Sequence, residues 1–193
     1  MTTMPIRTLG DPVLRERTRV PERFDAALAR LVDDMFETMY AAKGVGLAAQ
    51  QVGQALQLTV IDVRAATDRP STIEVDGKSA DVAEQMPLVL INPEIKPVGE
   101  MVTGPEGCLS FPELYGDIPR PESVEVKALN EKGKAIHFRA GGLLGRAVQH
   151  EVDHLRGILF IDRMDKPTKE NLRPELEALQ TETKARLAMA KKK

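Results

Sequence analysis

Residues 149–154 read Gln149-His150-Glu151-Val152-Asp153-His154 and lie in a stretch, 143–157, whose pattern predicts a helix. Residues four apart lie about 40° from each other around a helix, so His150 and His154 can reach one metal ion. Glu151 lies about 100° from His150, beside the metal, where it suits a base that acts on metal-bound water. The opposite face is apolar and can pack into a core; it carries Val148, Val152, Leu155 and Leu159.

Two imidazoles leave a catalytic zinc-type site incomplete, because such a site needs three protein ligands and an open position for water. Cys108, within Glu106-Gly107-Cys108-Leu109-Ser110, is one candidate for the third ligand. Thr103-Gly104-Pro105 predicts a sharp turn just upstream of it. A downstream carboxylate such as Glu175 is the other candidate, since many proteases combine this histidine spacing with a later glutamate. The residues alone leave both candidates open. The remaining histidine, His137, is predicted to be an ordinary strand residue.

The segments around this helix predict an α+β fold, with small mixed or antiparallel β-sheets packed around the central metal-binding helix and further helices at both ends. Residues 22–42 predict an amphipathic helix with Pro21 near its first turn. Residues 57–63 and 88–91 predict strands, the second stopped by Asn92-Pro93, and residues 124–138 predict a hairpin. The polar residues 65–87 predict an exposed insertion. From residue 167 onward the chain is charged and helix-forming.

The length and composition bound the class of protein. The 193 residues suit one globular domain, and a net charge of −2 argues against a general nucleic-acid binder, so no specific DNA binding is expected. No stretch has the roughly 20 apolar residues that a membrane span needs. A single cysteine excludes an intrachain disulfide and fits a reducing compartment. We therefore expect a cytoplasmic protein with no membrane contact.

Three separated segments together resemble the peptide deformylase family of the bacterial and organellar type. Residues 44–51, Gly-Val-Gly-Leu-Ala-Ala-Gln-Gln, resemble its G-x-G-x-A-A-x-Q motif, residues 106–110 resemble E-G-C-L-S, and residues 149–154 resemble Q-H-E-x-D-H. The resemblance extends from about Ile6 to Met164. Two positions depart from the family pattern. Gln50 stands where proline is common, and Tyr115 stands where some relatives carry an arginine that helps to hold the peptide.

The resemblance implies a hydrolase that removes the formyl group from formyl-methionyl nascent peptides. It implies one divalent metal on Cys108, His150 and His154, commonly Fe²⁺, with Zn²⁺, Ni²⁺ or Co²⁺ able to occupy the same ligands. It makes Glu151 the general acid/base, and it assigns the Gln51 amide and the backbone N–H of Leu109 to the oxyanion hole. The expected substrate pocket comprises Gly44, Val45, Gly46, Glu106, Leu143 and Ala147.

The two histidines are also compatible with two other functions. A zinc endopeptidase with a downstream glutamate ligand, or a non-catalytic module stapled by the metal, would also use the two histidines. We expect a catalytic domain over residues 1–166 and a helical basic extension over 167–193. The extension ends Lys191-Lys192-Lys193, and the resemblance makes ribosome contact through it a hypothesis.

Overall fold

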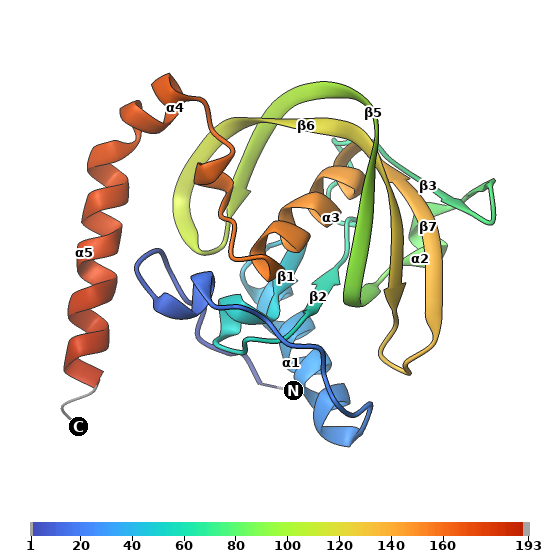
Figure 1. The fold of residues 1–193 in the computed structure, drawn as a ribbon, viewed down its shortest axis with the longest axis horizontal. Coiled ribbons are helices and arrows are strands. Elements are labelled where there is room, and N and C mark those ends of the chain that lie inside the picture. Colours follow the sequence, from blue (N-terminus) through green and yellow to red (C-terminus); the bar gives the residue numbers. More distant parts are fainter. Residues whose placement is uncertain (1, 191–193) are drawn as a thin grey trace.

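Helix α3, Gly142–Leu155, crosses the middle of the molecule and is buried along nearly its whole length (Figure 1). The computed structural model describes residues 2–190. Val148 and Val152 pack into the main apolar cluster, as the sequence predicts. The first residue of the helix, Gly142, packs closely against the Pro70 carbonyl. A side chain at this position, where φ is +61°, would collide with that carbonyl. The helix ends at Leu155, and Gly157 (φ +70°) turns the chain away.

Seven strands form one antiparallel sheet that bends around α3, in the order β1-β2-β5-β6-β7-β3-β4. The strands are β1 (Gly46–Ala48), β2 (Leu58–Ile61), β3 (Ser71–Val75), β4 (Lys78–Ala80), β5 (Leu88–Cys108), β6 (Phe111–Leu129) and β7 (Ala135–Gly141). Three register shifts interrupt the long β5–β6 pair, and bulges of this kind bend a strand. The pair therefore arches over the helix in Figure 1. An antiparallel sheet around a central helix, with further helices at both ends, confirms the predicted α+β class.

Two local predictions in this region are wrong and one is incomplete. Residues 65–87 are largely exposed, as predicted, but they also contribute β3, β4 and the short helix α2 (Val82–Gln85), and Ile73 and Met86 are buried. Asn92 does not end a strand; it adopts φ +50° at a bulge within β5. Residues 103–105 form no turn, since they continue β5 in register with β6. Strand pairing overrides these proline and glycine signals, and the prolines lie where the ladder is irregular or at a sheet edge.

Helix α1, Ala26–Ala41, supplies the predicted amphipathic helix but begins later than expected. The Asp25 carboxylate caps it by accepting hydrogen bonds from the backbone N–H groups of Ala27 and Leu28. Phe24 therefore lies outside the helix and is 40% exposed. The buried side of α1, with Met35 and Met39, packs against β1, β2 and the 3-10 helix η2 (Ala49–Val52). Helix α1 therefore supports the glycine-rich residues 44–51, which contain β1 and most of η2.

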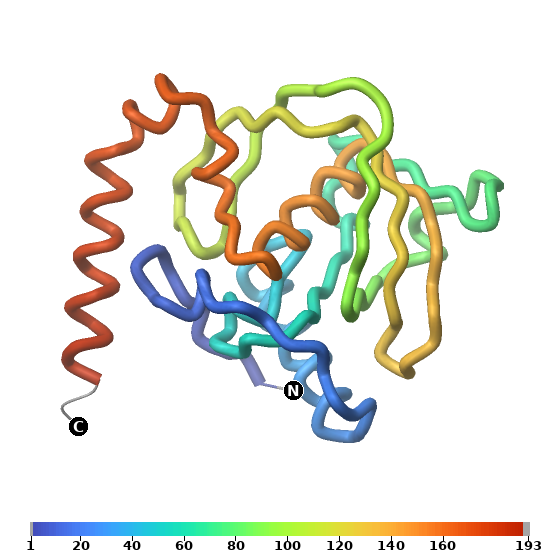
Figure 2. The backbone as a smooth tube through the Cα atoms, in the orientation of Figure 1, coloured from blue at the N-terminus to red at the C-terminus, as the bar shows by residue number. Residues whose placement is uncertain are grey.

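The C-terminal part comprises η3 (Phe160–Asp162), α4 (Lys166–Asn171) and α5 (Arg173–Ala190), which follow α3. Figure 2 shows α5 alongside the N-terminal segment that contains the 3-10 helix η1 (Pro12–Arg15). Leu176 joins a third apolar cluster, and the hydroxyls of Thr8 and Thr183 lie 2.7 Å apart. The predicted helix after residue 167 is confirmed, and the predicted basic end, Lys191-Lys192-Lys193, lies outside the described residues.

Candidate metal centre

The structure brings Cys108, His150 and His154 together. Cys108 is the last residue of β5, and the two histidines lie one turn apart on α3. One ligand atom from each lies within 4.8 Å of the others, and Cys108 Sγ is 3.2 Å from His154 Nε2. Metal–sulfur bonds of about 2.3 Å and metal–nitrogen bonds of about 2.1 Å place ligand atoms at such separations. Glu175 is exposed on α5 and does not join this group.

A buried carboxylate orients one of these histidines. Glu106 Oε2 lies 3.0 Å from His150 Nδ1, which leaves Nε2 of the same ring to face a metal. Glu106 also accepts hydrogen bonds from Arg120 and Arg146. Burial alone would raise the pKa of Glu106, but the hydrogen bonds from His150 and Arg120 outweigh it and lower the pKa to about 2. Glu106 therefore remains a carboxylate that holds the ring.

The network continues from Arg120 to Asp153, one turn after His150 on the helix. Arg120 Nη1 lies 2.8 Å from Asp153 Oδ2, and Asp153 also binds Arg163 at 2.6 Å. Arg120, Glu106 and Asp153 are all nearly inaccessible to solvent. The sequence analysis did not identify Arg120. The only local signal was Asp153 in the helix motif, because a carboxylate on a buried helix needs a cationic partner. Alternating charges satisfy one another here, as buried ions require.

Glu151 lies beside the metal group, as its position on the helix predicts. It is 4% exposed, and its Oε2 has no hydrogen-bond partner among residues 2–190. Burial raises its pKa to about 7. Gly46 packs directly on this side chain, since a Cβ added there would lie 2.9 Å from Glu151 Cγ and Cδ. A glycine is thus needed beside the carboxylate, and the carboxylate can exchange a proton near neutral pH.

Gln51 points its amide nitrogen toward the same place. The backbone N–H of Ala48 donates to Gln51 Oε1 at 2.9 Å, which fixes the orientation of the amide. Gln51 Nε2 then lies 3.1 Å from Ser110 Oγ and 3.6 Å from Cys108 Sγ. Ser110 belongs to the sequence motif of residues 106–110 but was not among the expected site residues. Its hydroxyl accepts a hydrogen bond from the Gln51 amide. A buried N–H donor therefore faces the ligand group.

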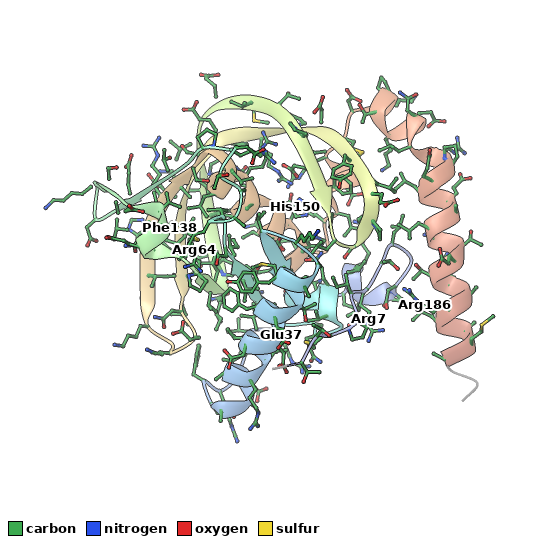
Figure 3. All side chains as sticks on the ribbon, turned by 180° about the vertical axis from the view of Figure 1, so that it is seen from behind. Arg7, Glu37, Arg64, Phe138, His150 and Arg186 are labelled. Atoms are coloured by element: carbon green, nitrogen blue, oxygen red, sulfur yellow. The ribbon has the colours of Figure 1, made fainter. Side chains whose placement is uncertain are left out.

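An open cavity of about 660 Å³ leads to these groups from the surface. Every residue expected in the substrate pocket lines it: Gly44, Val45, Gly46, Glu106, Leu143 and Ala147. Leu109 lies against Gly44, with its Cδ1 2.7 Å from where a Cβ would be. Tyr115 and Arg69 also line the cavity, and sequence reasoning did not place Arg69 there. In Figure 3, His150 lies in the middle of the molecule, beneath the long strands.

The known proteins that this chain resembles are peptide deformylases. A model of the polypeptide deformylase family matches residues 3–170. The peptide deformylase of Opitutus terrae is 44% identical over 178 residues, which are 91% of this chain and 92% of the relative. That of Methylacidiphilum infernorum is 48% identical over 169 residues, 88% of each chain.

Solved structures agree with these sequence matches. Arabidopsis thaliana peptide deformylase 1B in complex with an inhibitor has a TM-score of 0.81 and 38% identity, covering 95% of this chain and 93% of that chain. The Thermus thermophilus enzyme has a TM-score of 0.79 and 39% identity, covering 94% and 99%.

Proposed function

Because the chain belongs to the polypeptide deformylase family and is a peptide deformylase, we propose how its own residues hydrolyse the formyl group of formyl-methionyl peptides. The observation that carries the proposal is the grouping of three metal-ligand side chains with a buried carboxylate and a buried amide donor at the end of one open cavity. Hydrolysis of a formamide at neutral pH needs an activated water, a proton carrier and a site for the developing oxyanion.

The group formed by Cys108, His150 and His154 fits one divalent metal. We propose these three as the ligands and Fe²⁺ as the native metal, with Zn²⁺, Ni²⁺ or Co²⁺ able to replace it. When bound, the metal would lower the pKa of water toward about 7 and so supply the nucleophile. Glu106 keeps His150 in the ring orientation that leaves Nε2 free.

Glu151 is proposed to carry the proton. A carboxylate whose pKa is raised to about 7 by burial can take a proton from the attacking water and deliver it to the leaving amine. Gln51 Nε2 and the backbone N–H of Leu109 are proposed to donate hydrogen bonds to the formyl oxygen as it gains negative charge. The support for Gln51 is its anchored amide, which needs no reorientation during the reaction.

The methionine side chain is proposed to occupy the apolar part of the cavity. Ala147 and Leu143 come from α3, one turn and two turns before His150 respectively, and Val45 comes from the facing loop. Gly44 and Gly46 would let the substrate backbone approach closely. Apolar walls favour methionine because burial of its side chain removes apolar surface from water.

The two other functions lose their support. A zinc endopeptidase with a Glu175 ligand conflicts with the exposure of Glu175 on α5, away from the ligand group. A metal that only staples the fold would leave no role for a buried, unpaired Glu151 oxygen at the end of an open cavity.

The Glu151→Ala variant tests the mechanism. We expect it to keep its metal, because Glu151 is no ligand, and to lose nearly all turnover of formyl-Met-Ala-Ser. Elemental analysis and release of formate measure the two properties on one preparation. An active, metal-loaded Glu151→Ala enzyme would refute the acid/base assignment, and an inactive wild type would refute the proposed mechanism as a whole.

We further propose where this activity takes place. Among residues 2–190 no helix is long and apolar enough to cross a membrane. The enzyme is proposed to act in the cytoplasm on nascent peptides, with residues 1–166 as the catalytic unit. Residues 167–193 are proposed as an extension that contacts the ribosome through Lys184, Arg186 and the final lysines.

A further inference from the structure

Three side chains that line the cavity are cationic, and three others are carboxylates, those of Glu106, Glu113 and Glu151. Lys43, Arg69 and Arg146 line the cavity. Arg146 is already committed, since it donates to Glu106 and to the carbonyls of Val102 and Ile118. Arg69 is different: it makes one long hydrogen bond, of 3.4 Å, to the Pro105 carbonyl. No carboxylate lies within ion-pair distance of Arg69 or Lys43 in the part of the chain from residue 2 to residue 190.

The carboxylates near the cavity do not cancel Arg69. Glu106 is already bound by two arginines and His150, and Glu151 is buried at the end of the cavity. Glu113 belongs to the part of β6 beside Cys108, whereas Arg69 lies against Pro105. Asp68 precedes Arg69 but does not line the cavity. Arg69 therefore lines the cavity with guanidinium N–H groups that no carboxylate of residues 2–190 accepts.

The distance from Arg69 to the metal group identifies the part of a substrate that it can meet. Pro105 lies three residues before Cys108 along β5, and with the register shift after Gly107 the two are at most about 10 Å apart. An extended peptide with its formyl group at the metal spans a similar length by its third residue. Side chains nearer the formyl group would lie among the apolar walls instead.

We propose that Arg69 is a specificity-determining residue that favours formyl-methionyl peptides with an acidic side chain at the third position. The inference rests on the proposed function. A partly exposed arginine binds a carboxylate weakly, so the expected preference is modest, roughly two- to fivefold in kcat/KM. It should shrink at about 1 M salt, where charges are screened beyond about 3 Å.

The experiment compares two isosteric substrates, the C-terminal amides of formyl-Met-Ala-Asp and formyl-Met-Ala-Asn. The ratio of their kcat/KM values is independent of the fraction of active enzyme, so partial misfolding of a variant does not affect it. We expect a ratio above two for the wild type at low salt and a ratio below one for Arg69→Glu. Arg30→Glu is the matched control, because it changes net charge equally on an exposed part of α1 outside the cavity and should keep the wild-type ratio.

The possible results separate the inference about Arg69 from the proposed function. A wild-type ratio of one, or an Arg69→Glu ratio equal to that of the wild type, would overturn the inference while the hydrolysis of both peptides upheld the proposed function. An equal fall of the ratio in Arg30→Glu would also overturn it, by assigning the preference to net charge. Failure of the wild type to hydrolyse the Asn peptide would overturn the proposed function, and the inference with it.

Discussion

At the scale of single residues, Gln51 carries the amide nitrogen that we propose as an oxyanion donor, and this nitrogen lies 3.1 Å from Ser110 Oγ and 3.6 Å from Cys108 Sγ. Its Oε1 is held by the Ala48 N–H, so the amide nitrogen is directed at the cavity before substrate binds. We expect Gln51→Leu to lower kcat by about 10²–10³-fold, as removal of an oxyanion donor does elsewhere. Steady-state kinetics with formyl-Met-Ala-Ser measure this change. An effect confined to KM would mean that Gln51 binds the ground state.

Cys108 tests the ligand set at the same scale. We expect Cys108→Ala to lose stoichiometric metal, because two imidazoles alone bind a divalent ion weakly. Glu175→Ala is the control and should retain full occupancy, since Glu175 is exposed on α5. Elemental analysis after purification gives both numbers. Full occupancy in Cys108→Ala would reject the proposed ligands.

At the scale of secondary-structure elements, Arg120 joins strands to the helix. It lies on β6, binds Glu106 on β5 and Asp153 on α3, and is buried with both. Its loss would leave two buried carboxylates short of a counterion, which costs about 3 kcal/mol or more. His150, which we propose as a metal ligand, would also lose the support that reaches it through Glu106.

We therefore expect Arg120→Met to lower the Tm of the metal-loaded protein by roughly 6–12 °C and to reduce metal occupancy. Arg163→Met is the matched control, because Arg163 binds the same Asp153 but is 43% exposed. Its Tm should fall by about 4 °C or less. Calorimetry on both variants measures the difference, and equal shifts would contradict the role given to the buried arginine.

At the scale of the whole molecule, α5 joins the two ends of the chain. Thr183 is buried against Thr8, and Arg186 Nη2 donates to Thr8 Oγ1 at 2.8 Å, so Arg186 contacts the body of the protein as well as solvent (Figure 3). Residues 184–190 do not line the cavity. The end of α5 can therefore be removed without touching the metal centre.

Truncation after Thr183 is expected to leave hydrolysis of formyl-Met-Ala-Ser unchanged and to weaken co-sedimentation with ribosomes at low salt. Lost lysine and arginine contacts to phosphate account for the weakening, since counterion release makes such binding strongly salt-dependent. If full-length and truncated proteins pellet equally with ribosomes, the extension does not dock there. Loss of peptide hydrolysis would instead show that α5 supports the catalytic unit.

The sequence by itself determined the features that depend on local spacing. A helical repeat places His150 and His154 on one side of α3 and Val148 and Val152 on the other, whatever surrounds the helix. The hairpin turn after Leu129 and the helix after residue 167 depend on equally local signals, and both are confirmed. The predicted start of α1 at residue 22 was too early, because the helix begins only after the Asp25 cap.

Only the tertiary structure decided what depends on pairing between distant segments. The proline and glycine residues of β5 predict breaks, yet the ladder with β6 carries the strand through residue 108 and delivers Cys108 to the histidines. The same pairing buries Arg120 between Glu106 and Asp153. The loop before β3 brings Arg69 to the cavity mouth. Each of these contacts joins residues far apart in the chain, and their spacing in sequence carries no information about their distance in space.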